Sequence, residues 1–362
     1  MRMYVGTYTG PASEGIYFVD LNVSTGALSE PVLAAKTKNP AFLATHPNGR
    51  WIYAALEVGD FNGRPTGGVG AFAIDEKNNN KTGTLTPINA ESSEGNGACF
   101  VSVTHDGKAV LVANYGGGNV ALLPIDPNTG AVRKATSVDQ HHGSSANAAR
   151  QQRAFAHSIY PTPDGRFALS ANLGTDEVIV YRLDTTAGTL TRIGEAKLPP
   201  GTGPRHLAFH PSGKYVFAIG ELTNRVHVLT WNADTGALTP ADSATTLPED
   251  FKLPNTTAEV TVSADGRFVY GSNRGHDSIA VLSFDVATGA LVPVAHTSTG
   301  GVGPRHFALS ADGKFLVAAN QTTSTLVCFA IDPKTGTLSP TGSQVKVGNA
   351  CCVRFVGSLA RE

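Results

Sequence analysis

The chain has little charge and a balanced net charge. Asp, Glu, Lys and Arg make up 16% of its 362 residues, and the formal net charge is −1. The phosphate backbone of nucleic acids selects strongly basic surfaces, so we expect no nucleic-acid partner. No run approaches the ~20 apolar residues that a membrane-spanning helix needs, so we expect no membrane partner.

Cysteine is equally scarce, and its placement argues against metal or disulfide chemistry. The four cysteines, Cys99, Cys328, Cys351 and Cys352, form no CxxC pair and no His/Cys cluster with zinc spacing. We therefore expect buried thiols, no metal site and no cofactor. The N-terminal segment has no charged region followed by an apolar one. We expect a cytoplasmic protein, or a periplasmic one if a signal peptide has been removed.

The sequence also lacks the motifs of covalent and nucleotide-dependent catalysis. It contains no G-x-S-x-G elbow, no P-loop, no dinucleotide fingerprint after an initial strand and no H-E-x-x-H. A covalent nucleophile is therefore not favoured.

Glycine, by contrast, is abundant, and many of the 40 glycines recur in two repeating units. The first unit is a turn of the type Thr-Gly-x-Leu, with seven copies centred on Gly26, Gly83, Gly130, Gly188, Gly236, Gly289 and Gly336. The second is a turn between two apolar strands, with six copies centred on Gly49, Gly107, Gly165, Gly213, Gly266 and Gly313. Such turns favour tight hairpins, because glycine accepts a positive φ.

A repeat of about 50 residues with four strands is typical of a β-propeller blade. The two chain ends supply the missing seventh hairpin. NACCVRFV resembles the strand before each hairpin, and MRMYVGTYTG resembles the strand after it. We predict an all-β fold: one domain over residues 1–362, a seven-bladed β-propeller closed by pairing of the N- and C-terminal strands. A β-sandwich is the alternative, which a sevenfold repeat disfavours.

Polar residues gather where this arrangement brings strand ends together. In each blade the innermost strand runs to the glycine hairpin and the second strand returns, so their polar ends share one face. That face combines three cations, three acids and three histidines: Arg205, Arg274, Arg305, Glu57, Glu221, Glu259, His157, His206 and His306. Convergent polar groups predict a site at the mouth of a central channel. The structural alternative is that these residues cap turns or pair with neighbouring blades.

One segment interrupts the repeat on the same face. Residues 137–156, SVDQHHGSSANAARQQRAFA, are polar and have little apolar periodicity. We expect an insertion loop over the site, either a lid or a solvated segment.

Several strings resemble the lactonase propeller family, which includes bacterial propeller-type 6-phosphogluconolactonases and fungal 3-carboxy-cis,cis-muconate lactonizing enzymes. They include RQQRAFAHSIYPTPDGRFALSAN, GPRHLAFHPSGKYVFAIGEL and AEVTVSADGRFVYGSNRGHDSIAV, and the resemblance covers essentially the whole chain. It implies a metal-independent propeller that opens or closes lactones of acidic sugars or muconates. The family's His, Glu and two Arg map onto His157, Glu221, Arg205 and Arg274. Relatives often carry a further His where this chain has Phe155.

We therefore predict a hydrolase of an anionic lactone, 6-phosphoglucono-δ-lactone in the first instance. Arg205 and Arg274 would orient the lactone and stabilise the oxyanion. His157 or Glu221 would activate water, and the other would protonate the leaving ring oxygen. Further substrate-binding residues would be His206, Arg305, Glu57, Asn273 and Gln321. A muconate-lactonizing enzyme and a non-catalytic binding propeller are the alternatives, and the sequence does not set the oligomeric state.

Overall fold

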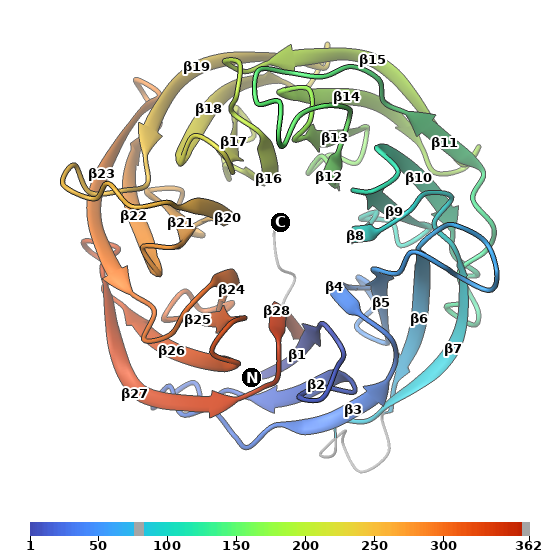
Figure 1. The fold of residues 1–362 in the computed structure, drawn as a ribbon, viewed down its shortest axis with the longest axis horizontal. Helices are drawn as coiled ribbons and strands as arrows, with labels where there is room; N and C mark the ends of the chain where they lie inside the picture. The colour runs from blue at the N-terminus through green and yellow to red at the C-terminus, as the bar shows by residue number, and fades with distance from the viewer. Residues whose placement is uncertain (76–82, 357–362) are drawn as a thin grey trace.

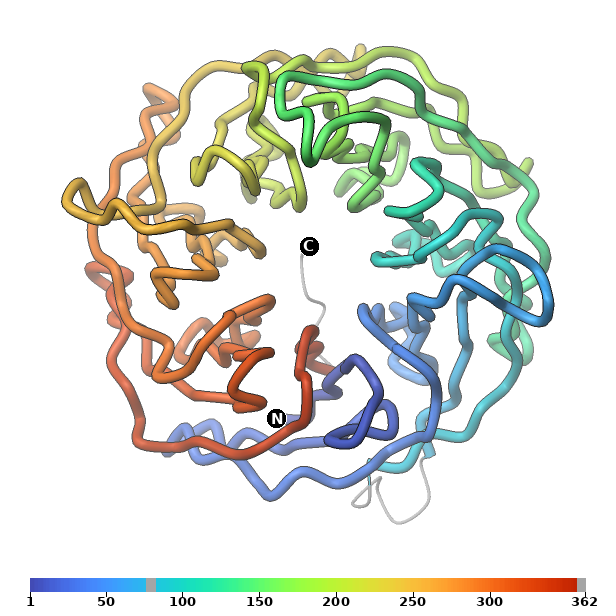
Figure 2. Tube along the Cα trace, viewed as in Figure 1, coloured from blue at the N-terminus to red at the C-terminus, as the bar shows by residue number. Residues whose placement is uncertain are grey.

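A computed structural model describes residues 1–75 and 83–356, in which the regular elements are all β-strands arranged as a ring (Figure 1; Figure 2). Seven antiparallel sheets of four strands each radiate from one axis. The predicted seven-bladed β-propeller is confirmed. Within the described residues, no helix is long and apolar enough to cross a membrane.

The two strands nearest the axis in each blade carry the site. The innermost strands are β4 (Pro40–Thr45), β8 (Ala98–Val103), β12 (Ala156–Pro161), β16 (Pro204–Phe209), β20 (Thr256–Val262), β24 (Pro304–Leu309) and β28 (Ala350–Val356). The second strands are β1 (Arg2–Thr7), β5 (Trp51–Leu56), β9 (Ala109–Asn114), β13 (Phe167–Asn172), β17 (Tyr215–Gly220), β21 (Phe268–Arg274) and β25 (Phe315–Asn320).

The two outer strands complete each blade. The third strands are β2 (Gly15–Asp20), β6 (Gly68–Ile74), β10 (Asn119–Pro124), β14 (Glu177–Asp184), β18 (Arg225–Asn232), β22 (Ser278–Asp285) and β26 (Thr325–Ile331). The outermost strands are β3 (Val32–Lys36), β7 (Leu85–Ser92), β11 (Ser137–Gln140), β15 (Thr189–Lys197), β19 (Ala237–Thr245), β23 (Ala290–Ser298) and β27 (Leu338–Lys346).

The ring closes where the two ends of the chain meet, as predicted. β28 pairs antiparallel with β1, from Arg2 opposite Val356 to Thr7 opposite Ala350. One blade thus takes its innermost strand from the C-terminal part of the chain and its other three from the N-terminal part. This pairing gives every blade of the ring an innermost strand.

Burial explains the low charge of the sequence. Strands β5, β9 and β13 are buried at every residue, because both of their faces pack against neighbouring blades. The outermost strand β15, in contrast, is mostly exposed, with Leu190 and Ala196 as its buried positions. The four cysteines are free and buried, as expected.

The Thr-Gly turns join the third and outermost strands and pack against the neighbouring blade. At Gly130, φ is +75°, and a Cβ atom would lie 2.4 Å from the ring of Trp51. Both the backbone conformation and the close approach therefore require glycine at this turn.

The insertion is shorter than its sequence suggested. Ser137–Gln140 is not part of a loop but forms β11, the outermost strand of the β8–β11 blade. Its side chains alternate between half-buried and exposed, so it carries no apolar signal. The loop therefore comprises residues 141–155, and β12 begins at Ala156.

Candidate active site

A β-bulge interrupts every innermost strand close to its start. In β16, for example, Pro204 pairs with Gly220 and His206 with Ile219, so Arg205 has no partner in the ladder. Equivalent breaks occur in the other six blades. The residues at these bulges are Ala41, Cys99, His157, Arg205, Ala258 together with Glu259, Arg305 and Cys351. A bulge re-aims side chains, which is how reactive groups are directed toward the axis.

A second set of seven residues lies at the end of each second strand, next to the bulges. These residues are Tyr8, Glu57, Tyr115, Leu173, Glu221, Arg274 and Gln321. The Glu221 amide, for example, donates to the carbonyl of Gly203 in the turn that precedes β16. The polar members of the two sets, Glu259 apart, form what we call the axial cluster: His157, Arg205, Arg305, Tyr8, Glu57, Tyr115, Glu221, Arg274 and Gln321.

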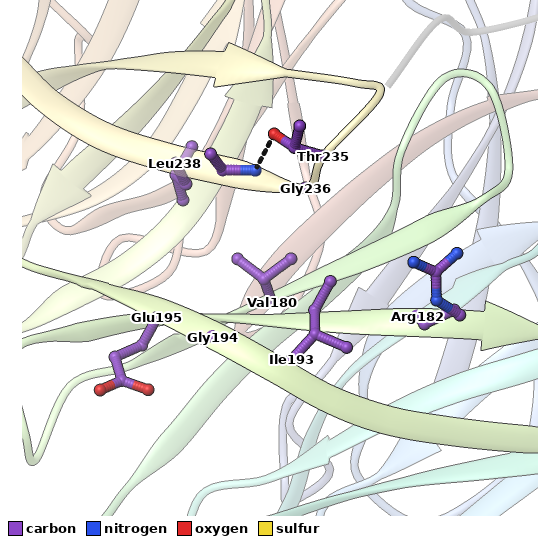
Figure 3. A pocket seen from close by; sticks show the side chains of 9 residues that line it. Val180, Arg182, Ile193, Gly194, Glu195, Thr235, Gly236 and Leu238 are labelled. Atoms are coloured by element: carbon purple, nitrogen blue, oxygen red, sulfur yellow. Dashed lines mark hydrogen bonds between the residues drawn. The ribbon is translucent and has the colours of Figure 1, made fainter.

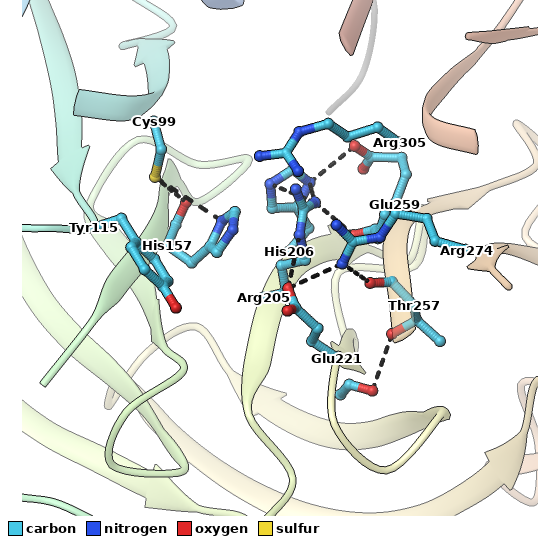
Figure 4. A network of polar contacts seen from close by, with 12 residues as sticks. Cys99, Tyr115, His157, Arg205, His206, Glu221, Thr257, Glu259, Arg274 and Arg305 are labelled. Atoms are coloured by element: carbon cyan, nitrogen blue, oxygen red, sulfur yellow. Dashed lines mark hydrogen bonds and ion pairs between the residues drawn. The ribbon is translucent and has the colours of Figure 1, made fainter. Parts of the chain in front are cut away.

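Glu221 lies at the centre of three guanidinium groups. Its Oε2 is 3.2 Å from Nε of Arg205 and 3.1 Å from Nη2 of Arg274 (Figure 4). Its Oε1 accepts a hydrogen bond of 2.6 Å from Nη2 of Arg150. Although burial opposes ionisation, Arg274 and Arg205 hold the pKa of Glu221 at about 2. The carboxylate is therefore ionised at neutral pH and is a very weak base.

Backbone carbonyls fix the two buried arginines. Nη1 of Arg205 donates to the carbonyl of Ala258, and Nη2 of Arg274 donates to that of Thr257, both at 2.7 Å. Nε of Arg205 faces the carboxylate of Glu221, whereas Nε of Arg274 is buried without a hydrogen-bond partner within the described residues. Burial lowers the pKa of Arg274 to about 10, so it still carries its charge at neutral pH. Both groups are positioned cations.

His157 approaches the cluster from the other side, next to Tyr115 (Figure 4). Its ring is 5.2 Å from that of His206 and 5.4 Å from that of Tyr115. Its Nδ1 lies 4.0 Å from Sγ of Cys99. Burial, and then the charge of Arg205, lowers the pKa of His157 well below its usual value. The imidazole is neutral at pH 7 and available as a proton acceptor.

A buried carboxylate joins two further histidines beneath Arg205. Oε2 of Glu259 is 2.8 Å from Nδ1 of His206 and 3.2 Å from Nε2 of His306. Because Nδ1 of His306 accepts the Val353 amide, its Nε2 carries the proton that Glu259 accepts. Nη1 of Arg205 is nearly equidistant from both nitrogens of His206, at 3.4 and 3.2 Å, so it stacks on the ring. His206 thus supports Arg205.

Arg305 forms the opposite wall together with Tyr8 and Glu57. Its Nη2 donates to the Tyr8 hydroxyl at 2.9 Å, and that hydroxyl donates to Oε2 of Glu57 at 2.5 Å. The guanidinium also lies over the Tyr8 ring, 5.3 Å from its centre. Burial raises the pKa of Glu57, whereas Arg305 and Tyr8 favour its ionised form.

Two predicted substrate-binding residues, Asn273 and Gln321, take no part in the contacts described above. Asn273 is buried, and its amide donates to the carbonyl of Thr246 and accepts the hydroxyl of the same residue, both at 2.7 Å. Its hydrogen bonds thus hold the end of a blade. Gln321 is half-buried at the position equivalent to Glu221.

Sequence reasoning missed Arg150, Tyr8 and Tyr115 as members of the site. Tyr8 and Tyr115 occupy positions that the repeat itself equates with Glu221, so the repeat held the signal. Arg150 lies in the aperiodic loop, where no sequence pattern indicated its place in the site. Nη2 of Arg150 lies 3.5 Å from the Tyr115 hydroxyl and donates to Glu221. Both contacts depend on the path that the loop takes in the folded protein.

Other parts of the described chain offer weaker alternatives. A groove of about 420 Å³ lies on the outside of the ring between β14–β15 and β18–β19 (Figure 3). Val180, Ile193 and Leu238 line it with Arg182 and Glu195, and no hydrogen-bonded constellation converges there. No group of three or more His, Cys, Asp or Glu side chains in residues 1–75 and 83–356 is placed to hold a metal ion.

Comparison with known proteins places these features in context. The family described as "Lactonase, 7-bladed beta-propeller" matches residues 2–355. A Bacillus subtilis protein named 6-phosphogluconolactonase is 38% identical over 304 residues, which is 84% of this chain and 83% of that protein.

Solved structures give the same picture. The periplasmic gluconolactonase of Pseudomonas aeruginosa superimposes with a TM-score of 0.88 at 30% identity, covering 98% of this chain and 99% of that one. A Lactobacillus plantarum protein superimposes with a TM-score of 0.89 at 32% identity, covering 98% and 99%.

Proposed function

The chain belongs to the family of seven-bladed β-propeller lactonases, and from this premise we propose that it hydrolyses 6-phosphoglucono-δ-lactone to 6-phosphogluconate without a metal ion. The family resemblance predicted from the sequence is thereby confirmed. The substrate proposal is supported by the Bacillus subtilis relative, which carries the name 6-phosphogluconolactonase.

One observation carries the proposal: a neutral histidine faces positioned arginines that share a single carboxylate. His157 is neutral because burial lowers its pKa, whereas Arg205 and Arg274 remain charged beside Glu221. Ester hydrolysis needs a proton acceptor for water and a cation where the carbonyl oxygen becomes negative. Both lie within one cluster here.

We propose the following reaction. His157 takes a proton from water, and the oxygen of that water bonds to the lactone carbonyl carbon. The carbonyl oxygen becomes an oxyanion, which the positive charges of Arg205 and Arg274 stabilise. The bond from this carbon to the ring oxygen breaks, and protonated His157 returns its proton to the leaving oxygen. The new carboxylic acid releases its proton to solvent.

Glu221 has a supporting part in this scheme rather than an acid–base one. A carboxylate with a pKa of about 2 neither holds a proton to give at neutral pH nor competes for one from water. In this proposal its task is to hold Arg205 and Arg274 in place beside the reacting carbonyl. The sequence left the roles of His157 and Glu221 open, and this division is our choice between them.

We assign substrate binding to the wall opposite Glu221. Arg305 and Glu57, linked through Tyr8, offer a cation and an acceptor to the hydroxyl-rich ring of a sugar lactone. We assign Gln321, at the position equivalent to Glu221, to the same wall. We assign His206 and Asn273 a supporting role. His206 stacks under Arg205, and Asn273 holds the strand end that precedes Arg274.

The test is a pH-stat assay with freshly prepared 6-phosphoglucono-δ-lactone in the presence of EDTA. It compares the wild type with His157→Ala and Arg274→Ala. We expect hydrolysis well above the spontaneous rate in the wild type, no effect of EDTA, and loss in both variants. No acceleration by the wild type would refute the substrate. A rate abolished by EDTA would refute metal independence.

The alternatives have their own readouts in the same experiment. Turnover of a carboxymuconate without lactone hydrolysis would indicate a lactonizing enzyme that uses these residues in the reverse direction. No turnover of either would favour a binding propeller. We place the enzyme in the cytoplasm, because a phosphorylated sugar lactone forms there; fractionation of cells would test this against a periplasmic location.

A further inference from the structure

The loop over the axial cluster carries an arginine that the reaction above does not use. Arg150 lies in the 141–155 loop, and its side chain is 39% exposed, compared with 3% for Arg205 and 18% for Arg274. It is therefore the arginine of the Glu221 group that is most open to solvent.

Only part of the Arg150 guanidinium is occupied. Its Nη2 donates to Glu221 and lies 3.5 Å from the Tyr115 hydroxyl. Within residues 1–75 and 83–356, its Nε and Nη1 have no hydrogen-bond partner. One side of the planar fork is thus anchored to the protein, while the donors on the other side are free for a ligand.

The turn that presents Arg150 is firmly held. Gln151, which is fully buried, donates to Oδ1 of Asp176 at 2.7 Å and to the carbonyl of Leu173 at 2.8 Å. Asp176 also accepts the hydroxyl of Ser145 and the amides of Gly201 and Gly203, the latter at 2.7 and 2.6 Å.

One buried carboxylate therefore fixes the Arg150 turn relative to the turn that leads into Arg205. Such a connection pre-organises two cations on different blades and lowers the entropy cost of binding an anion between them.

The charges of the cluster favour an anionic ligand at its exposed end. Arg150, Arg205, Arg274 and Arg305 lie among three carboxylates, Glu57, Glu221 and, beneath Arg205, Glu259. The guanidinium groups therefore outnumber the carboxylates by one. A phosphate monoester carries about −1.5 to −2 at pH 7 and has three oxygens that suit a guanidinium fork such as the free side of Arg150.

We propose that Arg150 is the specificity residue for the distal phosphate of the substrate. This inference rests on the proposed function, in which the lactone carbonyl lies between His157 and Arg205. Those two residues occupy bulge positions on the innermost strands, whereas Arg150 reaches the cluster from the overlying loop. In 6-phosphoglucono-δ-lactone the phosphate is carried on C6, beyond the carbon that is bonded to the ring oxygen, and in this placement we orient it toward the loop.

The test measures binding of two stable products, 6-phosphogluconate and gluconate, by titration calorimetry. The proteins are the wild type, Arg150→Gln and the control Arg153→Gln. Arg153 lies in the same loop but donates to the Gly116 carbonyl and stacks on Phe155, away from Glu221. We expect the wild type to bind the phosphorylated acid at least about 10-fold more tightly, the scale of one charge-assisted bond.

Arg150→Gln should reduce this preference to about threefold or less, and Arg153→Gln should retain it. An unchanged preference in Arg150→Gln, an equal loss in both variants, or no preference in the wild type would each overturn the inference. Lactone hydrolysis is measured on the same samples. If the preference for 6-phosphogluconate depends on Arg150 but the protein hydrolyses no lactone, the proposed function is refuted and the inference about Arg150 is not.

Discussion

Nη2 of Arg274 lies 3.1 Å from Oε2 of Glu221, the oxygen that Nε of Arg205 also approaches. The two arginines come from different blades, Arg274 from the end of β21 and Arg205 from the bulge of β16. A single carboxylate thus sets the separation of both cations. Changing either partner alters the charge of the site and the position of the arginine that remains.

Removal of Arg274 tests its contact with the developing oxyanion. We expect Arg274→Ala to lower kcat/KM by roughly 100-fold or more, the scale of losing one positioned donor, and Arg274→Lys to recover only part of it because an ammonium lacks the fork. Steady-state kinetics on the lactone measure this. The control is Arg267→Gln, an exposed arginine at the other end of the same strand that pairs with Asp265. Equal losses in both variants would refute the assignment.

Replacement of Glu221 with Gln should change the acid stability of the protein. The pKa of Glu221 is about 2 when folded and 4.5 ordinarily, so acid protonates the unfolded state first. Its stabilising contribution is complete above pH 4.5 and is lost as the pH falls toward 2. We expect Glu221→Gln to destabilise by about 3 kcal/mol at pH 7, because it leaves buried arginines uncompensated.

Urea unfolding between pH 7 and pH 3.5 measures this difference. The gap between the wild type and Glu221→Gln should narrow as the pH falls below 4.5, since the wild type alone loses the contribution of this carboxylate. A gap that stays constant across that range would contradict the ionised, arginine-bound state of Glu221.

Much of this arrangement could be predicted from the sequence. The recurring glycine turns identify the blades, and the alternation of inner and second strands brings His157, Arg205, Glu221 and Arg274 to one end of the ring. This works because a repeat converts sequence position into spatial position. The closing pair of β28 and β1 follows in the same way.

The remainder depends on features that leave no pattern. In GPRH, simple alternation would send Arg205 and His206 to opposite faces, but the bulge at Arg205 breaks the ladder there. His206 consequently bonds to Glu259 beneath Arg205. The bond between Arg150 and Glu221 spans 71 residues and depends on the path of an aperiodic loop. Bulges and loop paths arise from three-dimensional packing, which no local repeat encodes.

The pH dependence of catalysis should report the low pKa of His157. The neutral form is the active one, so kcat/KM falls when acid protonates the ring. Burial and the charge of Arg205 depress this pKa well below 6.5, and the fall therefore begins below pH 6.5. We expect a flat profile from pH 6.5 to 8 after subtraction of spontaneous hydrolysis. His157→Gln should lose roughly 100-fold or more in kcat/KM. A midpoint near 7 would show that the base is a different group.

Asp176 should control the order of two loops at once. Asp176→Asn puts an amide NH2 where one carboxylate oxygen now accepts two donors, either Gln151 and Gly203 or Ser145 and Gly201. An unsatisfied buried group costs about 1–3 kcal/mol, so we expect a loss of that size and faster hydrogen exchange in residues 145–151 and 201–203.

The matched control is Asp234→Asn, at a side chain that is 93% exposed, and it should change stability by less than about 0.5 kcal/mol. Because Arg150 lies within the first of these segments and Arg205 follows the second, Asp176→Asn should raise KM for the phosphorylated lactone more than it lowers kcat. A purely structural role would instead reduce the amount of folded enzyme and leave the KM of the remainder unchanged. If hydrogen exchange in Asp176→Asn becomes faster only through global unfolding, and its KM is unaltered, a positioning role for Asp176 is contradicted.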